Sequence, residues 1–391
     1  MQSVVTTITK DINITQGIGV VITTLLGSGI FIVPAISASL AGGNSLIGWI
    51  LISLFVIPIT YIFGIFGTKY PHIEGSAYFV QNAFGEKIGK TIGLMYLSII
   101  PIGPPVVIIT GASYLTSFFN HEILLLISFL MIGIIFILNQ YKFSISSKIG
   151  LVIVFLILLI ISIIAYNSFF QSNEINFKTL DNNFFKSIGI MFWCFVGIEA
   201  ISHLSSEFKN KNDFLKVVIY GIIITGFLYT LVGFSVLKYN IFGNEILNIQ
   251  SLILIFGTII PFYGKIIISI IGFFICLIAV NLYVASSTRI LYSYNKDKLT
   301  FNKSLILIIL AITITTTLKI LYDIHLETLI LYANGVFVLI YFFVGLSGIK
   351  LLKNIDKIVA IIATIILAAI IYFIGLSMIY AIDLSSTINH P

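Results

Sequence analysis

Charged residues are scarce in this sequence of 391 residues. They make up 9% of the chain, while 59% of the residues are hydrophobic and the mean hydropathy is +1.12. A soluble globular domain carries about a quarter charged residues. So few charges cannot cover a water-facing surface, which excludes an ordinary soluble domain. Lipid must therefore be the solvent for most of the chain.

Several residue types that mark other classes of protein are also rare. The two cysteines, Cys194 and Cys276, lie in apolar runs, where small buried side chains are a simpler interpretation than a disulfide or redox pair. The five histidines are scattered, without metal-ligand or acid–base spacing, which argues against a membrane-embedded enzyme. We expect no metal and no cofactor. The net charge of +6 comes from dispersed lysines rather than a basic patch, so nucleic acid is not an expected partner.

Long runs without charge predict membrane spans. A hydrocarbon core about 30 Å thick needs about 20 apolar residues per helix. Residues 381–391 contain Asp383 and are too short for a further span, so we predict eleven spans firmly and leave a short twelfth open. The predicted spans are 15–40, 46–68, 91–118, 122–140, 149–167, 184–206, 214–237, 263–288, 304–321, 327–348 and 358–381.

The basic residues predict the orientation of these spans. With the N-terminus inside, sixteen lysine and arginine residues fall on the cytoplasmic side and five on the outside. Such an asymmetry follows the positive-inside rule. The sequence thus predicts a multi-pass protein of the bacterial inner membrane, in one domain, with a cytoplasmic N-terminus. The polar stretches 167–183 and 238–250 are expected to be external loops.

Two of the predicted spans are interrupted by poor helix formers. The first contains Gly27-Ser28-Gly29, followed by Pro34, and the sixth carries Gly197 and Glu199 in mid-run. Unwound backbone at membrane depth is tolerated only where it lines a cavity or is buried in protein. Paired interruptions in corresponding helices of two halves indicate the central site of a transporter. Alternatively, the glycines only allow close packing of helices.

A broken helix exposes main-chain groups that can bind a zwitterion. The N–H groups of Gly27, Ser28 and Gly29 begin a half-helix whose positive dipole end attracts a carboxylate. Carbonyl groups near Leu25 in the first span, and near Trp193 and Val196 in the sixth, can accept hydrogen bonds from an ammonium group. The predicted substrate-binding residues are Leu25, Gly27, Ser28, Gly29, Ile30, Trp193, Cys194, Val196 and Gly197.

These motifs resemble those of the amino acid–polyamine–organocation (APC) superfamily. The segment 27–31 with Pro34 resembles its first-helix signature, residues 195–200 its sixth-helix motif, and residues 287–292 its basic loop after helix eight. More narrowly, segments 191–209, 70–85 and 331–335 resemble bacterial exporters of L-methionine and branched-chain amino acids. The resemblance covers almost the whole chain, except that the twelfth helix of the family is truncated here.

The resemblance implies an all-α membrane fold with a five-plus-five inverted repeat and discontinuous helices one and six. The repeats would span about 15–167 and 184–348, with an extra C-terminal helix at about 358–381. It also implies efflux of amino acids from the cytosol. A homodimer is an open possibility for its assembly. Uptake or exchange stays open as an alternative, because alternating access is reversible. A sensor or scaffold that binds an amino acid without transporting it is a second alternative.

The apolar surroundings of the breaks predict a neutral, hydrophobic amino acid such as methionine, leucine, isoleucine or valine. Ile30, Phe31 and Trp193 could wall its side chain, and the middle of the other inner spans offers no charge. A basic or acidic substrate would need a counter-charge there. Three further residues, Tyr96, Asn281 and Asn334, complete the predicted pocket with Phe31. The prolines of segment 101–105 either shape this pocket or only accommodate neighbouring helices.

Glu199 is the one carboxylate deep in a span beside a break. An ionisable group in a membrane segment is a functional candidate, and burial favours its neutral form. We predict that it couples or gates transport by taking up a proton. The resemblance implies the same role, because members of the family carry a proton-sensing glutamate at the matching place. The alternative is a protonated side chain that only bonds nearby backbone. His203, one turn later, is either a proton relay or a packing residue.

Overall fold

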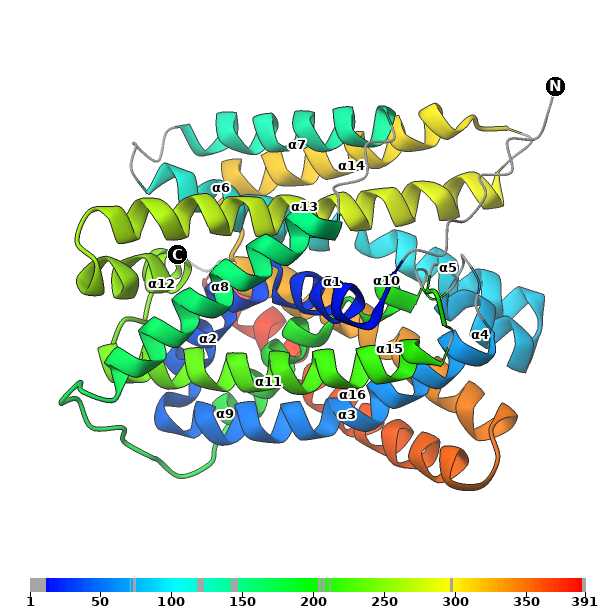
Figure 1. Ribbon diagram of the computed structural model, residues 1–391, viewed down its shortest axis with the longest axis horizontal. Helices are drawn as coiled ribbons and strands as arrows, with labels where there is room; N and C mark the ends of the chain where they lie inside the picture. The colour runs from blue at the N-terminus through cyan, green and yellow to red at the C-terminus, as the bar shows by residue number, and fades with distance from the viewer. Residues whose placement is uncertain are drawn as a thin grey trace.

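The computed structural model describes most of the chain. The described residues are 12–70, 72, 75–117, 123–141, 147–202, 205, 208–210, 212–295 and 298–388, and the side chains of 147–151, 200 and 376–388 are not described. The predicted relay residue His203 lies outside these ranges. Figure 1 shows the described part as a bundle of helices that run roughly parallel to the long axis of the molecule.

The helices follow the apolar runs of the sequence. The first half of the chain contains α1 (Ile14–Leu26), α2 (Gly29–Ala41), η1 (Gly42–Asn44), α3 (Ser45–Lys69), α4 (Ser76–Phe84), α5 (Glu86–Ile99), α6 (Gly103–Thr116), α7 (Leu124–Gln140) and α8 (Ser147–Ser168). The second half contains α9 (Asn182–Met191), η3 (Phe192–Phe195), α10 (Ile198–Ser202), α11 (Asp213–Tyr239), α12 (Glu245–Ile259), α13 (Tyr263–Tyr294), α14 (Phe301–Leu321), α15 (Leu326–Leu351) and α16 (Asn354–Ile388).

Seven helical stretches of the described chain are long and apolar enough to cross a membrane. They are Gly29–Lys69, Glu86–Thr116, Asp213–Tyr239, Tyr263–Tyr294, Phe301–Leu321, Leu326–Leu351 and Asn354–Gly375, and four shorter apolar helices accompany them. The protein is therefore an all-α, multi-pass membrane protein. Each of the eleven predicted spans overlaps one or more of these helices, and the first, third and sixth spans each contain an interruption. The repeat boundaries stay a prediction.

Two helices lie where loops were expected. The stretch 238–250 was predicted to be an external loop, but α12 begins at Glu245 and extends to Ile259. Asn244 caps α12, because its Oδ1 accepts a hydrogen bond from the Leu247 N–H at 2.9 Å. The short helix α4 lies between the second and third spans and packs against α5 and α15. The expected loop between α8 and α9 contains no helix in residues 171–180.

The broken helices lie inside the bundle. α1 packs against α8, α11 and α13, and α2 packs against α9, α11 and α12. In Figure 1, α7, α13 and α14 form one side of the bundle, and α3, α11, α15 and α16 form the other. The two breaks lie between these sides, so helices far apart in the sequence can enclose them.

Ion pairs tie helix ends together at both ends of the bundle. At the end predicted to be external, Lys319 Nζ lies 3.0 Å from Glu245 Oε1, and Lys186 Nζ lies 2.6 Å from Glu327 Oε1. At the opposite end, Lys69 Nζ lies 3.1 Å from Asp356 Oδ2. These described charges lie near helix ends, where they can remain close to water.

Candidate functional site

The first break separates α1 from α2 at Gly27 and Ser28. Gly27 ends α1 with φ +31°, and its N–H donates to the Thr23 carbonyl at 3.3 Å. The Phe31 N–H turns back to the Ser28 carbonyl at 3.1 Å. No described residue accepts a hydrogen bond from the N–H of Ser28, Gly29 or Ile30. The positive dipole end of α2 therefore carries unpaired donors, as an anion site requires.

The carbonyl end of the same break is occupied by Tyr229 from α11. Its hydroxyl donates to the Leu25 carbonyl at 2.8 Å and lies 3.2 Å from the Leu26 carbonyl. The Tyr229 ring stacks on Trp49, with centroids 5.1 Å apart and planes 2° apart. The Leu25 carbonyl, predicted to accept from an ammonium group, thus already has a donor, although a carbonyl oxygen can accept a second one.

The close approach of Tyr229 explains why residue 29 is a glycine. A Cβ atom there would lie 2.6 Å from the Tyr229 hydroxyl oxygen and 3.0 Å from Cys194 Sγ. Real Cβ atoms do not approach other atoms so closely, so a larger residue would push the two breaks apart. Gly29 therefore allows α2 to contact η3 and α11 directly.

The second break lies between α9 and α10. The chain tightens into η3, becomes extended at Val196 (φ −72°, ψ 134°) and turns at Gly197, whose φ of +127° suits glycine. The Trp193 carbonyl accepts from the Val196 N–H at 3.2 Å, whereas no described residue donates to the Val196 carbonyl. The Trp193 indole N–H donates to Ser28 Oγ at 3.3 Å, which links the two breaks.

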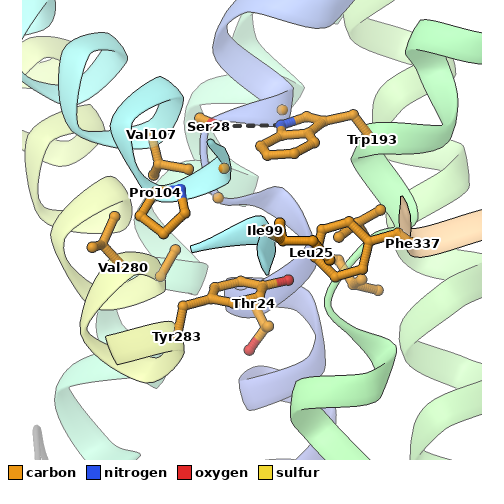
Figure 2. Close-up of a pocket in the computed structure, with 15 residues that line it drawn as sticks. Thr24, Leu25, Ser28, Ile99, Pro104, Val107, Trp193, Val280, Tyr283 and Phe337 are labelled. Atoms are coloured by element: carbon orange, nitrogen blue, oxygen red, sulfur yellow. Dashed lines mark hydrogen bonds between the residues drawn. The ribbon is translucent and has the colours of Figure 1, made fainter. Parts of the chain in front are cut away.

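A cavity lies at the two breaks, between α1, α5, α6, α13 and the segment around Trp193 and Val196. Figure 2 shows Trp193 at one end and Tyr283 at the other, with Pro104, Val107 and Val280 along one side. None of its lining residues carries a formal charge. The lining residues are Thr24, Leu25, Gly27, Ser28, Gly29, Ile99, Gly103, Pro104, Val107, Trp193, Val196, Ala279, Val280, Tyr283 and Phe337.

The few polar side chains of this wall are already bonded within the protein. Thr24 Oγ1 donates to the Val20 carbonyl at 2.8 Å, and Ser28 Oγ accepts from Trp193. The Tyr283 hydroxyl donates to Glu199 at 3.0 Å. The side chains therefore present a mainly apolar surface, and the main chain at the breaks supplies the unpaired polar groups. This combination is typical of small-molecule sites.

Glu199 lies behind this wall rather than in it. Its side chain is fully buried, and its Oε2 accepts from the Gly197 N–H at 3.0 Å and from the Tyr341 hydroxyl. Its Oε1 accepts from the Tyr283 hydroxyl at 3.0 Å. A buried carboxyl with three donors has the hydrogen bonds that an ionised form needs. Tyr283 both bonds to Glu199 and lines the cavity.

The structure brings six of the nine predicted substrate-binding residues to the cavity wall. They are Leu25, Gly27, Ser28, Gly29, Trp193 and Val196. Ile30, Cys194 and Gly197 do not line it. Cys194 lies behind Gly29, and Gly197 supports Glu199. Whether any of these residues binds substrate stays a prediction.

The four additional pocket residues predicted from the sequence all lie outside the wall. Phe31 packs edge-on against Tyr114, with ring centroids 4.7 Å apart, and Tyr96 stacks behind Tyr283 at 6.4 Å. Asn281 and Asn334 instead join helices to one another. Asn281 accepts from Asn139 Nδ2 at 2.8 Å, and Asn334 donates to the Gly189 carbonyl at 2.8 Å. Depth in a span does not determine which face a residue occupies, so these four residues miss the cavity wall, and a role in substrate binding stays a prediction for them.

Nine lining residues were not predicted, and most come from α5, α6 and α13. Pro104 is the exception, because the sequence predicts that the prolines of 101–105 either shape the pocket or only accommodate neighbouring helices. The other new members are Thr24, Ile99, Gly103, Val107, Ala279, Val280, Tyr283 and Phe337. Within the described ranges, no group of three His, Cys, Asp or Glu side chains could hold a metal ion.

Comparison with known proteins agrees with this architecture. Residues 12–301 match the family model described as "Amino acid permease". The L-methionine/branched-chain amino acid exporter YjeH of Escherichia coli is 31% identical over 391 residues, which cover 95% of this chain and 94% of that protein. An uncharacterized amino acid permease of Bacillus subtilis, YecA, is 26% identical over 95% of this chain and 92% of its own length. A cadaverine/lysine antiporter of E. coli is 28% identical over 56% of this chain and 52% of its own.

Proposed function

Since the chain belongs to the amino acid permease family, we propose that it is a secondary transporter that exports neutral, apolar amino acids from the cytosol. The proposed substrates are methionine, leucine, isoleucine and valine. The observation that carries the proposal is a cavity between two broken helices, where unpaired main-chain groups meet an apolar wall.

The main chain supplies a partner for each charged end of an amino acid. The unpaired N–H groups of Ser28, Gly29 and Ile30 favour a carboxylate, helped by the dipole of α2. The Val196 carbonyl, which has no described donor, favours an ammonium group. Because both partners are backbone dipoles, a zwitterion can be bound without any charged side chain.

The wall selects the side chain of the substrate. Val107, Val280 and Phe337 can contact an aliphatic or thioether group, whereas a lysine or arginine side chain would find no carboxylate among the lining residues. Burying an unpaired cation there would be costly. We therefore expect a different substrate class from that in the name of the cadaverine/lysine antiporter.

Glu199 supports coupling to protons. It is the buried carboxyl that lies one hydrogen bond behind the cavity, through Tyr283. Protonation would change the hydrogen bonds that hold α10 to α13 and α15. We propose that substrate efflux is exchanged for protons entering the cell, with the N-terminus of the protein in the cytoplasm.

Flux into proteoliposomes tests the transport proposal. Purified protein should move labelled methionine and leucine, and an excess of unlabelled isoleucine or valine should compete, whereas lysine should not. Binding without flux would favour a sensor or scaffold. Flux of lysine at comparable rates would overturn the proposed substrate class.

Direction needs a measurement in cells. During feeding with methionine- or leucine-containing dipeptides, expressing cells should hold smaller internal pools of these amino acids than cells without the protein. Larger pools in the expressing cells would favour uptake instead. A transport-inactive variant serves as the control for effects of expression itself.

A further inference from the structure

Tyr283 of α13 connects the cavity to the buried carboxyl. It is the one lining residue among the described positions that bonds to Glu199. Its ring packs between Tyr96 and Phe337, each with its ring centroid 6.4 Å away. The phenol O–H can rotate about its C–O bond, so the direction of the hydroxyl proton can change while the ring stays in place.

The two oxygens of Glu199 are not equivalent as sites for a proton. Oε2 accepts from the Gly197 N–H at 3.0 Å and from Tyr341. A proton on Oε2 could be donated to the Tyr341 hydroxyl, because a hydroxyl can also accept, while the remaining lone pair keeps the Gly197 N–H. Oε1 has the Tyr283 hydroxyl as its described partner, and a hydroxyl can either donate or accept. Only the Tyr283 hydroxyl lines the cavity, so protonation on Oε1 is the case that changes what the cavity presents to a substrate.

We propose that Tyr283 is a specificity-determining residue whose hydroxyl reverses its hydrogen bond when Glu199 takes up a proton. With Glu199 ionised, Tyr283 donates to Oε1 and offers the cavity only a lone pair, which accepts from an ammonium group. With Glu199 protonated, Oε1 donates to Tyr283, whose own proton turns toward the cavity. One proton is added to the carboxyl, and the phenol keeps its own.

The hydroxyl lies at the end of the cavity where this reversal matters. A Cβ atom on Gly197, the residue that follows Val196, would lie 3.5 Å from the Tyr283 oxygen and 3.1 Å from Thr24 Cγ2. This is the end that we assign to the ammonium group of the substrate. A proton on Glu199 would thus replace an acceptor by a donor beside that cation and weaken its binding.

Of the hydroxyls bonded to Glu199 in the described chain, that of Tyr283 is the one through which a reversal reaches the cavity. From α5, α13 and α15 the ionisable side chains that face it are the phenols of Tyr96, Tyr283 and Tyr341, and no described Lys, Arg or Asp is bonded to it. α1 contributes Thr24, a neutral group. Tyr341 bonds to Glu199 but does not line the cavity. Competition between proton and substrate is what exchange transport requires, so this inference rests on the proposed function and deepens it.

Equilibrium binding of labelled methionine to the purified protein, between about pH 5 and about pH 7.5, tests the inference. Methionine stays zwitterionic over this range, so its own charge does not change. Wild type should bind more tightly at the higher pH, by about tenfold, since one lost or repelled hydrogen bond is worth about 1.4 kcal/mol. Tyr283→Phe should reduce this ratio to within about twofold. The matched variant Tyr341→Phe should still bind methionine more tightly at the higher pH than at the lower pH.

A second ligand keeps the test independent of whether Tyr283→Phe folds. A methionine analogue that lacks only the amino group should show the opposite sign in wild type, with tighter binding at low pH, because Tyr283 then donates into the cavity. A Tyr283→Phe variant with the wild-type ratio, or an analogue with the same pH trend as methionine, overturns the inference alone. Failure of wild type to bind methionine at any pH overturns the proposed function and the inference with it.

Discussion

The two helix breaks differ in what closes them. At the first break, Tyr229 donates a neutral hydroxyl to the Leu25 and Leu26 carbonyls. At the second break, the carboxyl of Glu199 accepts from the Gly197 N–H. A phenol keeps its proton over the physiological range, whereas a carboxyl can gain one. The first break is thus a fixed element, and the second is the one that can respond to pH.

This difference assigns the breaks separate tasks. The unpaired donors of α2 can hold a carboxylate in the same way over this pH range, because the described residues that line the cavity beside them include no Asp, Glu, His, Lys or Arg. The second break combines the open Val196 carbonyl with the titratable Glu199. Recognition of the carboxylate and response to protons should therefore be separable by mutation, which the following predictions use.

Gly29→Ala should have the largest effect, because it disturbs both breaks. The new methyl group would lie 2.6 Å from the Tyr229 hydroxyl oxygen. Overpacking of this kind costs about 1–3 kcal/mol, or about 5- to 150-fold in affinity. Methionine flux in proteoliposomes should fall by that amount. Gly133→Ala in α7, where nothing lies within 4 Å, should transport normally. Equal loss in both variants would show that the contact at Gly29 is not the cause.

Glu199→Gln should remove the pH response while keeping the binding site. The amide has nearly the same shape but cannot ionise, so the ratio of methionine transport rates between about pH 5 and about pH 7.5 should fall from about tenfold to within about twofold. Rates over this range in proteoliposomes, at fixed internal pH, provide the measurement. An unchanged profile would contradict any coupling role of Glu199.

Tyr229→Phe should weaken binding at every pH alike. It removes one hydroxyl from two buried carbonyl oxygens, a loss of about 1 kcal/mol or about fivefold in affinity. The pH profile should keep its shape, in contrast to Glu199→Gln. Equilibrium binding of methionine across pH separates the two cases. A profile flattened by Tyr229→Phe would mean that the first break also titrates.

Trp193→Phe should have the smallest effect. The indole N–H lies 3.3 Å from Ser28 Oγ, near the long end of hydrogen-bond distances, and a phenyl ring keeps most of the wall apolar. We expect a loss of about twofold in methionine affinity. If the loss exceeded that of Tyr229→Phe, the indole would be holding the two breaks together more strongly than its geometry indicates.

The sequence could predict the breaks but not the enclosure around them. Gly27, Gly29 and Gly197 interrupt apolar runs, and local propensity is enough to place such interruptions. Tyr229 and Tyr283 sit on regular helices in other parts of the chain, and no local pattern reports that they point at a distant break. Only the packing of α11 and α13 against α1 brings them there.

Rotational position explains why some of the predicted residues do not line the cavity. Trp193 and Cys194 are neighbours in η3, yet one lines the cavity and the other lies behind Gly29, because successive residues of a 3₁₀ turn point in different directions. Asn281 is in the same helix as Tyr283 but faces Asn139. The helix α12 was partly missed because the polar residues at its start resemble a loop.

A structure with methionine bound is the most direct test of the central claim that main-chain groups of both breaks bind the amino acid. We predict its carboxylate within about 3 Å of the N–H groups of Ser28, Gly29 or Ile30, and its ammonium group at the Val196 carbonyl beside Tyr283. Methionine bound outside this cavity, or with its carboxylate paired to a lysine side chain, would contradict the account.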